Sequence, residues 1–296
     1  MLEALAGASH VALVAVLTTP PRPAGRRAAL AATPVGERAG LLGLPVLTPA
    51  RLRDPATVAD VSGLHAALGI LADYGKLVPS AILDLSPHGI LNLHPSLLPR
   101  HRGATPIPAA ILDGDAETGV TLFRMDAGLD TGPILASEAV ALVGDEDAPG
   151  LEARLATVAA DLLRRSLGPW LEGSLPAVAQ PREGASLTRP FRRDDGRLDP
   201  GRPAALLERQ VRALRPWPGT FVEASTGRVG VLRAEVASGE PGDEQGRLVW
   251  DAGSGLALAT AEGRLRLLEV QPAGGRRMDG ATFVRGRPGL IGARVG

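Results

Sequence analysis

The sequence predicts an α/β domain with a mostly parallel sheet, followed by a small, separate β domain. Over the first 145 residues, short apolar segments alternate with helical ones, which is typical of βαβ units. Residues 172–200 are rich in Pro, Gly and charge and follow neither apolar period, as expected of a linker. The segments beyond them are short, partly alternating and separated by turn sequences, a pattern that favours a small antiparallel barrel.

Six apolar segments are the candidate strands of the first domain, at 11–17, 44–47, 66–71, 89–94, 119–125 and 137–143. A short helix is expected between the fourth and fifth strands, with Thr105 placed to cap it, Pro106 in its first turn and Gly114 near its end. These elements place the helix directly after the most polar of the strands.

A longer helix is expected over about 148–167. Apolar residues recur there at spacings of three and four and share one face: Leu151, Leu155, Val158 and Leu162. The pair Gly168-Pro169 is expected to stop this helix.

The domain boundaries follow from these patterns. We expect a first domain at 1–175, a linker at 176–200 and a second domain at 201–296. The second domain begins with one helix at about 203–214. Five segments are its candidate strands: 219–224, 228–237, 246–252, 255–261 and 264–271.

Composition narrows the class of protein. The 296 residues contain no Cys, which excludes a disulfide framework, thiol catalysis and a Cys-ligated metal and predicts a cytoplasmic location. No apolar run approaches the length of about 20 residues that crosses a bilayer, so no membrane association is expected. The apolar run 11–17 has no preceding Lys or Arg and is expected to be a strand, not a signal peptide.

The formal charge of zero hides an asymmetry between the two parts. Residues 1–199 hold 18 Lys and Arg against 22 Asp and Glu, whereas residues 200–296 hold 14 against 10. The parts therefore carry −4 and +4. The basic C-terminal part is a hint of a polyanionic partner, and an ordinary Arg-rich surface explains the charge alone equally well.

The strand "GILNLH" carries two polar side chains that suit chemistry on a carbonyl group. Asn92 and His94 lie two apart, hence on one face, close to the carboxyl end where open α/β sheets bind ligands. The amide of Asn92 can stabilise an oxyanion, and the imidazole of His94 can accept or donate a proton. The alternative for these two residues alone is a hydrogen-bonded polar pair that ends a strand.

A second polar element is "MDAGLDTGPIL", residues 125–135. Asp130 stands in a tight turn between Gly128 and Gly132, where its carboxylate could orient His94 and stabilise the protonated ring. The alternative is an Asp that satisfies its own turn. That alternative explains Asp126 and Asp113 better.

The segment "ILNLHPSLLPRHRGATPI", followed by "GDAETGVTLFRMDAGLDTG", resembles the signature of the folate-dependent formyltransferases. Within them the chain is most similar to the methionyl-tRNA formyltransferases. Further similar segments are "PRPAGR" at 21–26, "YGKLVP" at 74–79, "RALRPWPGT" at 212–220 and "LLEVQPAGGRRM" at 267–278. The similarity therefore covers nearly the whole chain, and it implies a Rossmann-like formyltransferase domain followed by an OB-like barrel that holds tRNA.

Carried over position by position, the resemblance implies roles for three groups of residues. The catalytic set falls on Asn92, His94 and Asp130. The folate-binding segment falls on Ser96, Leu97, Leu98 and Pro99, and the loop that contacts the acceptor end of tRNA falls on Arg22 and Arg26. A solvated Pro/Arg loop is the alternative for the last pair.

The implied reaction is attack by the α-amine of initiator methionyl-tRNA on the formyl group of 10-formyltetrahydrofolate, by a monomer that needs no metal. Two alternatives stay open: a formyltransferase acting on a sugar amine or another small amine, and a folate- or RNA-binding protein without turnover. Asp73, Pro21 and Pro200 depart from the residues usual in the family, and the start of the chain departs further. The chain starts at "MLEALAGASHVALV", which resembles only the end of the first helix and the second strand, so a central first strand is expected to be missing.

Overall fold

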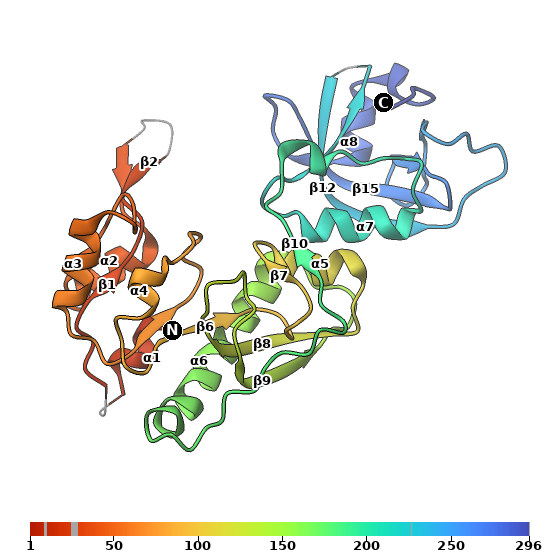
Figure 1. The fold of residues 1–296 in the computed structure, drawn as a ribbon. Coiled ribbons are helices and arrows are strands. Elements are labelled where there is room, and N and C mark those ends of the chain that lie inside the picture. The colour runs from red at the N-terminus through yellow and green to blue at the C-terminus, as the bar shows by residue number, and fades with distance from the viewer. Residues whose placement is uncertain (9–10, 25–28, 226, 296) are drawn as a thin grey trace. The chain divides into compact units, whose positions relative to one another are not determined.

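The computed structural model describes residues 1–8, 11–24, 29–225 and 227–295. Its contacts divide the chain into two compact units (Figure 1). The first comprises 1–104, 118–140 and 154–187, and the second comprises 105–117, 141–153 and 188–296. Two short segments from the middle of the chain thus pack with the C-terminal part. The boundaries predicted from the sequence stay a prediction.

The first unit begins with two pairs of short strands. β1 (Val16–Leu17) and β4 (Val46–Leu47) are parallel, and β2 (Arg22–Ala24) and β3 (Ala29–Ala31) are antiparallel. The helices of this part are α1 (Leu2–Ala6), α2 (Pro34–Leu41), α3 (Pro55–Gly63) and α4 (Ser80–Leu83). α2 begins after Thr33 because the Thr33 hydroxyl accepts a hydrogen bond from Gly36 N at 3.1 Å.

The functional side chains lie on a four-stranded sheet with the order β5–β6–β8–β9. Its strands are β5 (Gly69–Leu71), β6 (Ile90–His94), β8 (Glu117–Arg124) and β9 (Ile134–Ala141). β5 and β6 are parallel, but β6 and β8 are antiparallel. The sheet is therefore mixed, and the prediction of a mostly parallel sheet is wrong for this part.

The parallel strand pairs belong to two separate sheets. Among the described residues, no strand pairing joins β1 and β4 to the four-stranded sheet. One edge of β5 and one edge of β1 thus lack a strand partner in the described part of the chain. The expectation that a central strand is missing between them stays a prediction.

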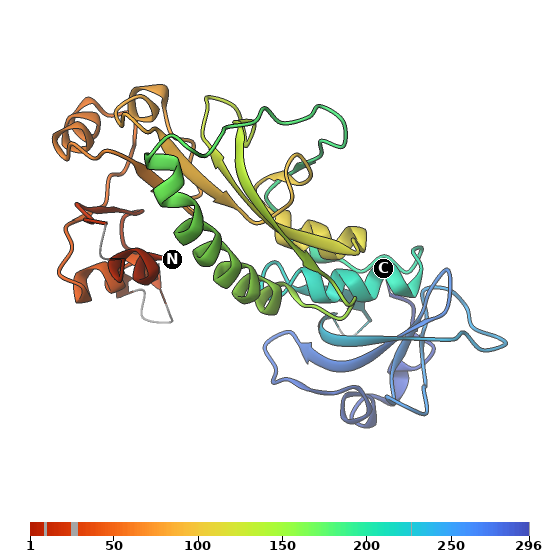
Figure 2. The same cartoon turned by 90° about the horizontal axis from the view of Figure 1, so that it is seen from below.

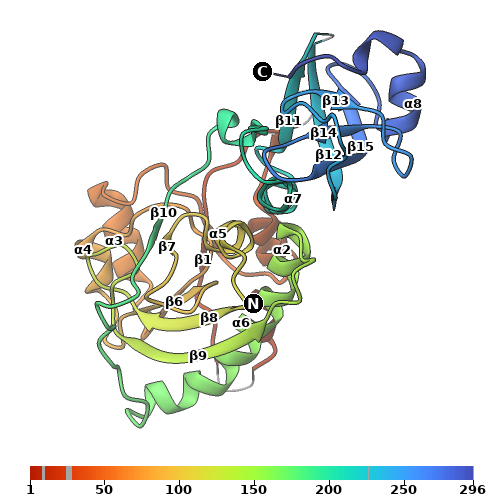
Figure 3. The ribbon, with the colours of Figure 1, turned by 90° about the vertical axis from the view of Figure 1, so that its right-hand side faces the viewer.

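The long helix α6 (Ala148–Leu171) lies beside β8 and β9 over the part that belongs to the first unit (Figures 2 and 3). Leu155 and Leu162 are buried, as their spacing predicts. The expected stop at Gly168-Pro169 is wrong, because Pro169 lies inside the helix. A Pro near a helix end removes a single backbone donor, and the helix ends shortly afterwards, where Ser174 N and the Ser174 hydroxyl both bond to the carbonyl of Pro169.

The second unit is built around one antiparallel sheet with the order β11–β12–β15–β14–β13, and β16 pairs with β15 (Figures 1 and 3). The strands are β11 (Thr220–Ala224), β12 (Gly227–Ala237), β13 (Leu248–Val249), β14 (Ala257–Ala259), β15 (Arg264–Pro272) and β16 (Met278–Asp279). All five predicted strand segments are confirmed. In the described residues the end strands β11 and β13 are not paired with each other, so the sheet is not a closed barrel.

Three helices complete this unit: α5 (Pro106–Asp113), α7 (Ala204–Ala213) and α8 (Gly280–Arg285). Leu207 and Val211 of α7 are buried in one apolar core with Val231, Leu258 and Leu267 of the sheet. α5 packs against α7, and Gly114 ends α5 in the left-handed conformation, as expected.

The short remaining elements are β7 (Arg102–Gly103), β10 (Leu187–Thr188) and the 3₁₀ helices Arg193–Gly196 and Pro288–Leu290. Thr105 stands at the N-cap of α5, but its hydroxyl accepts no hydrogen bond from a helix N–H and donates to the carbonyl of Arg189. The prediction that Thr105 caps α5 through its side chain is therefore wrong. Among the described residues, no helix combines the length and the apolar character that crossing a membrane requires.

Candidate functional site

β6 brings Asn92 and His94 to the interior of the first unit. The strand has a neighbour on each side, and Asn92 lies opposite Phe123 while His94 lies opposite Thr121. Both residues are buried, with 7% and 4% of their surface exposed. The amide of Asn92 makes no hydrogen bond with any residue that the structure describes. Because its amide atoms are not among the fully buried atoms without a partner, they stay accessible to water or to a ligand.

The hydrogen bond of His94 fixes which ring nitrogen can act as a base. Nε2 lies 2.8 Å from the carbonyl oxygen of His101, which can only accept a hydrogen bond, so Nε2 carries the hydrogen. In the neutral ring the lone pair is therefore on Nδ1. Nδ1 faces the Asp130 carboxylate, with 3.7 Å to Oδ2.

The environment of His94 keeps its ring neutral near pH 7. Burial lowers the pKa of His94 below its ordinary value, and the Asp130 charge and the bond to the His101 carbonyl oppose this shift without reversing it. The ring is thus in the form that accepts a proton, and an anionic group lies beside it to stabilise the product of that step.

Hydrogen bonds between residues of the turn that carries Asp130 stabilise the conformation of this turn. Asp126 Oδ1 accepts bonds from Gly128 N at 3.0 Å and from the Thr131 hydroxyl at 2.8 Å, so the prediction that Asp126 only satisfies the turn is confirmed. Asp130 adopts the left-handed conformation, with φ of 53°. A Cβ at Gly132 would lie 1.9 Å from the carbonyl oxygen of Arg124, so only Gly fits there.

The carboxylate of Asp130 is tied to a second loop. Its Oδ2 accepts a hydrogen bond from Gly103 N at 2.7 Å, and its side chain is 12% exposed. The structure thus brings Asn92, His94 and Asp130 together from β6 and from the turn between β8 and β9. The roles of the three residues stay a prediction.

The segment 96–99 is packed inside the unit. Ser96 is fully buried, and its hydroxyl donates to the carbonyl of Arg100 at 2.6 Å. Thr121 links this segment internally, because its hydroxyl accepts from Leu98 N and donates to Ser96 O. Leu97 and Pro99 are half-buried. Ser96 N also donates to the carbonyl of His94 at 2.9 Å, so the backbone and the hydroxyl of Ser96 both have partners inside the unit.

Two residues that the sequence patterns do not indicate, Gln180 and Arg102, lie beside the turn that carries Asp130. Gln180 Nε2 donates to the carbonyls of Asp130 and Gly132, at 2.9 and 2.8 Å. Its Oε1 accepts from the guanidinium of Arg102, at 3.1 and 2.6 Å. Gln180 falls in the predicted linker, and no local pattern distinguishes it from other polar linker residues.

The first unit also has an open cavity of about 470 Å³ beside the β2–β3 pair. It is lined by Arg22, Lys76, Tyr74, two Thr and small residues: Thr19, Pro20, Pro23, Ala31, Ala32, Thr33 and Gly75. The Tyr74 hydroxyl is buried and has no hydrogen-bond partner among the described residues. Arg22 is exposed on β2, whereas Arg26 lies outside the described residues.

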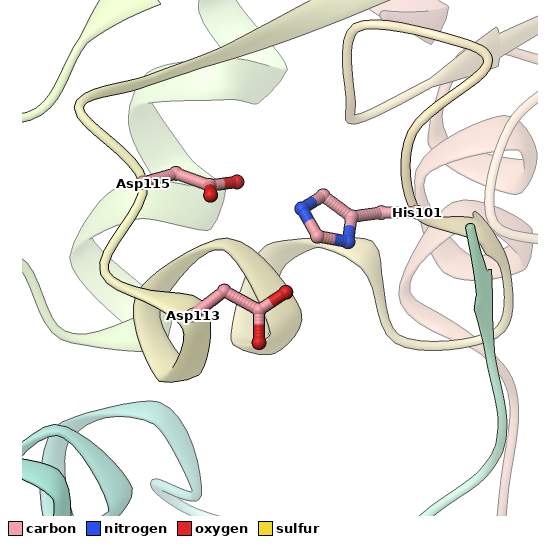
Figure 4. A group of neighbouring side chains, drawn as sticks. All are labelled: His101, Asp113 and Asp115. Atoms are coloured by element: carbon pink, nitrogen blue, oxygen red, sulfur yellow. The ribbon is translucent and has the colours of Figure 1, made fainter. Parts of the chain in front are cut away.

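Figure 4 shows three further side chains, His101, Asp113 and Asp115. His101 lies on the loop after Pro99 in the first unit, whereas both carboxylates belong to the second unit, at the end of α5 and just beyond it. His101 and the two carboxylates thus belong to different units of the chain. The expectation that the reaction needs no metal stays a prediction.

Two family models match the chain. The model described as "Formyl transferase" matches residues 1–167, and the model described as "Formyl transferase, C-terminal domain" matches residues 191–288. Residues 168–190, which include Gln180, lie outside both matches.

Relatives match over nearly the full length of the chain. A protein of Methylobacterium sp. (strain 4-46), named "Methionyl-tRNA formyltransferase", is 45% identical over 298 residues, or 99% of this chain and 94% of its own. A protein of the same name from Thermus thermophilus is 42% identical over 299 residues, or 100% of this chain and 95% of its own.

Solved structures share the fold. HypX from Aquifex aeolicus in complex with tetrahydrofolic acid is 15% identical, with a TM-score of 0.62 over 92% of this chain and 47% of that one. Phosphoribosylglycinamide formyltransferase from Bacillus halodurans is 28% identical, with a TM-score of 0.50 over 57% of this chain and 89% of that one. On the family models and on relatives more than 40% identical over almost the whole chain, this chain belongs to the formyltransferase family.

Proposed function

We propose that the chain transfers the formyl group of 10-formyltetrahydrofolate to the α-amine of initiator methionyl-tRNA, as the names of its relatives imply for those proteins. The observation that carries this proposal is the buried set of Asn92, His94 and Asp130. A free amide, a neutral imidazole and a carboxylate converge there from separate elements of the first unit. These are the groups that acyl transfer to an amine requires.

The amine must lose a proton for the transfer to be completed. An α-amine has an ordinary pKa of roughly 7.7–8.0, so much of it is protonated at neutral pH. The neutral amine is the nucleophile, so its ammonium form first releases one proton to water. As the new C–N bond forms, His94 accepts the next proton from the attacking nitrogen on Nδ1, since Nε2 is committed to the His101 carbonyl. The resulting imidazolium lies beside Asp130, which stabilises its charge. The same nitrogen then returns the proton to the leaving nitrogen of the folate.

Asn92 supplies the second part of the chemistry. The folate provides the formyl carbonyl, on which negative charge develops as the amine attacks. The N–H groups of Asn92 have no other partner among the described residues, and in this proposal they donate to that oxygen. The Asn92 amide fits a carbonyl ligand, and the half-buried side chain of Leu97 is proposed as an apolar contact for the folate.

The tRNA is proposed to contact both units. Arg22 and Lys76 place two positive charges at the 470 Å³ cavity, where they would attract the phosphates of the acceptor end, and the sequence resemblance gives Arg26 the same role. Residues 200–296 carry a net charge of +4, which favours a phosphate backbone as partner. We propose that their antiparallel sheet is a variant of the OB-like fold. The cytoplasmic location, the monomeric state and the domain boundaries at 175 and 200 are part of the same proposal.

Competition between acceptors tests the proposed function. The purified chain is given labelled 10-formyltetrahydrofolate with initiator methionyl-tRNA, elongator methionyl-tRNA, free methionine or an amino sugar, each in a separate reaction. We expect label to enter the initiator tRNA at least about a hundredfold faster than any small amine. A sugar amine as the best acceptor would overturn the tRNA assignment. Folate binding without transfer to any acceptor would overturn the enzyme assignment.

A further inference from the structure

Residues 178–186 form one segment of the first unit, which we call the strap. It bonds at one end to the strand after the Asp130 turn and at the other end to the loop after Pro99. At one end Val178 pairs with Ile134, with hydrogen bonds of 2.7 and 2.8 Å in both directions. At the other end Ser186 accepts bonds from the backbone of His101 and Arg102, at 2.8 and 2.9 Å. The strap thus runs from the strand after the Asp130 turn to the loop that accepts the hydrogen bond of His94.

Gln180 lies between these anchors, and its amide is fully used. A Gln amide has two donors and an oxygen with two lone pairs. Both donors bond to backbone carbonyls, those of Asp130 and Gly132, and both lone pairs accept from Arg102. This arrangement determines which way the amide points, because the reverse orientation would place N–H groups against a guanidinium.

Gln180 connects two backbone segments that together position the Asp130 carboxylate. The first segment contains Asp130 itself, whose left-handed conformation costs a non-Gly residue free energy and therefore needs stabilising contacts. Arg102 is next to Gly103, whose N–H donates to Asp130 Oδ2. A shift of either loop would therefore change the distance of 3.7 Å between Asp130 and His94.

We propose that Gln180 is a positioning residue that acts through Asp130 on the basicity of His94. This inference rests on the proposed function and adds a residue that neither family match covers. Without the Gln180 donors, the carbonyls of Asp130 and Gly132 lose their partners, the turn relaxes and the carboxylate moves from the ring. Gln180 touches none of the three proposed catalytic side chains and affects the reaction only through their geometry.

The test compares Gln180→Ala and Gln180→Glu with the wild-type chain in formyl transfer to initiator methionyl-tRNA. Gln180→Glu keeps an acceptor for Arg102 but has no donor for the two carbonyls, and its similar size keeps the test valid if Gln180→Ala does not fold. We expect kcat to fall about tenfold to a hundredfold in both variants, as for a small misplacement of a catalytic group. The KM values for folate and tRNA should change less than about twofold. In Gln180→Ala, which adds no charge, the rise of kcat with pH should also move to lower pH, because the raising effect of the displaced Asp130 carboxylate on the pKa of His94 is weakened.

Gln210 provides a matched control. Its Nε2 also donates to two backbone carbonyls, those of Asp195 and Arg197, at 2.7 and 3.1 Å, but in the second unit. Gln210→Ala should lower the melting temperature without moving the pH dependence of kcat. In an Asp130→Asn background, Gln180→Ala should cost less than about twofold further, because its effect passes through that carboxylate.

The outcomes separate this inference from the proposed function. A wild-type chain that formylates no tRNA overturns the proposed function itself. An active wild type with unchanged kcat in both Gln180 variants overturns the positioning role alone. The same fold-loss in wild-type and Asp130→Asn backgrounds, or a change confined to KM, also overturns it.

Discussion

Replacing Asp130 with Asn removes the charge beside His94 and preserves the size of the side chain. Asp130 Oδ2 lies 3.7 Å from His94 Nδ1 and accepts a hydrogen bond from Gly103 N at 2.7 Å. An amide oxygen in the same place keeps the bond to Gly103. The substitution therefore acts on the electrostatics of the site and leaves its loops in place.

The size of the effect follows from the distance between the two groups. At 3.7 Å, with an effective dielectric constant of about 20, a carboxylate and an imidazolium attract by about 4 kcal/mol. The side chains of His94 and Asp130 are only 5% and 12% exposed, so solvent screens the pair little. With the proton about half transferred in the transition state, about 2 kcal/mol is lost, which is a fall in kcat of about thirtyfold.

The pH dependence gives a second readout of the same substitution. Burial lowers the pKa of His94, whereas the negative charge of Asp130 raises it. Asp130→Asn removes that charge, so the effect of burial is no longer opposed by it. The pKa of His94 then falls further. Because the neutral ring is the active form, the rise of kcat with pH should shift to lower pH while the plateau falls.

The assay is steady-state formylation of initiator methionyl-tRNA between about pH 5 and 9, with both substrates saturating. Asp126→Asn is the matched control, since Asp126 is a carboxylate of the same turn that bonds only within it. The control should keep the wild-type plateau and profile. A plateau that changes less than about threefold in Asp130→Asn, or a rise that moves to higher pH, would refute the assignment of Asp130.

Three further predictions test other parts of the account. Asn92→Ala should lower kcat about a hundredfold to a thousandfold in the same assay, with an unchanged KM for folate, because one oxyanion donor is lost. A rise in the KM for folate alone would show that Asn92 acts in folate binding and not in the chemical step. Gly132→Ala should lower both the melting temperature and the activity, because the added Cβ would lie 1.9 Å from the Arg124 carbonyl oxygen. An unchanged melting curve by circular dichroism would contradict this close approach of the two backbone segments. Binding of initiator tRNA, measured by filter retention, should weaken steeply between about 50 and 200 mM salt while folate binding, measured by fluorescence, hardly changes; equal salt dependence of both ligands would argue against phosphate contacts.

Local patterns are enough to predict most elements and the centre of the site. The apolar neighbours of Asn92 and His94 predict their strand, and a Gly-containing turn predicts the structural role of Asp126. The five strands of the C-terminal sheet are also predictable, since alternation and turn residues are local properties. These features depend on residues that are close together in the sequence.

Features that depend on distant residues escape such patterns. The direction of β8 relative to β6 depends on how the chain returns after α5, and periodicity gives no direction for a strand. Gln180 bonds to a carbonyl 50 positions earlier, so its segment looks like a plain linker. Pro169 predicts a helix stop from the sequence, although the loss of one donor does not prevent α6 from continuing to Leu171.

The most direct test of the central claim is a single-turnover transfer of labelled formyl from folate to initiator methionyl-tRNA, with the chain in excess over both substrates. Excess enzyme removes product release from the measured rate, so the rate reports on the chemical step. We expect complete transfer by the wild-type chain and a transfer slower by about two to four orders of magnitude in His94→Ala, with folate bound equally well by both. Transfer by His94→Ala at the wild-type rate would contradict the account.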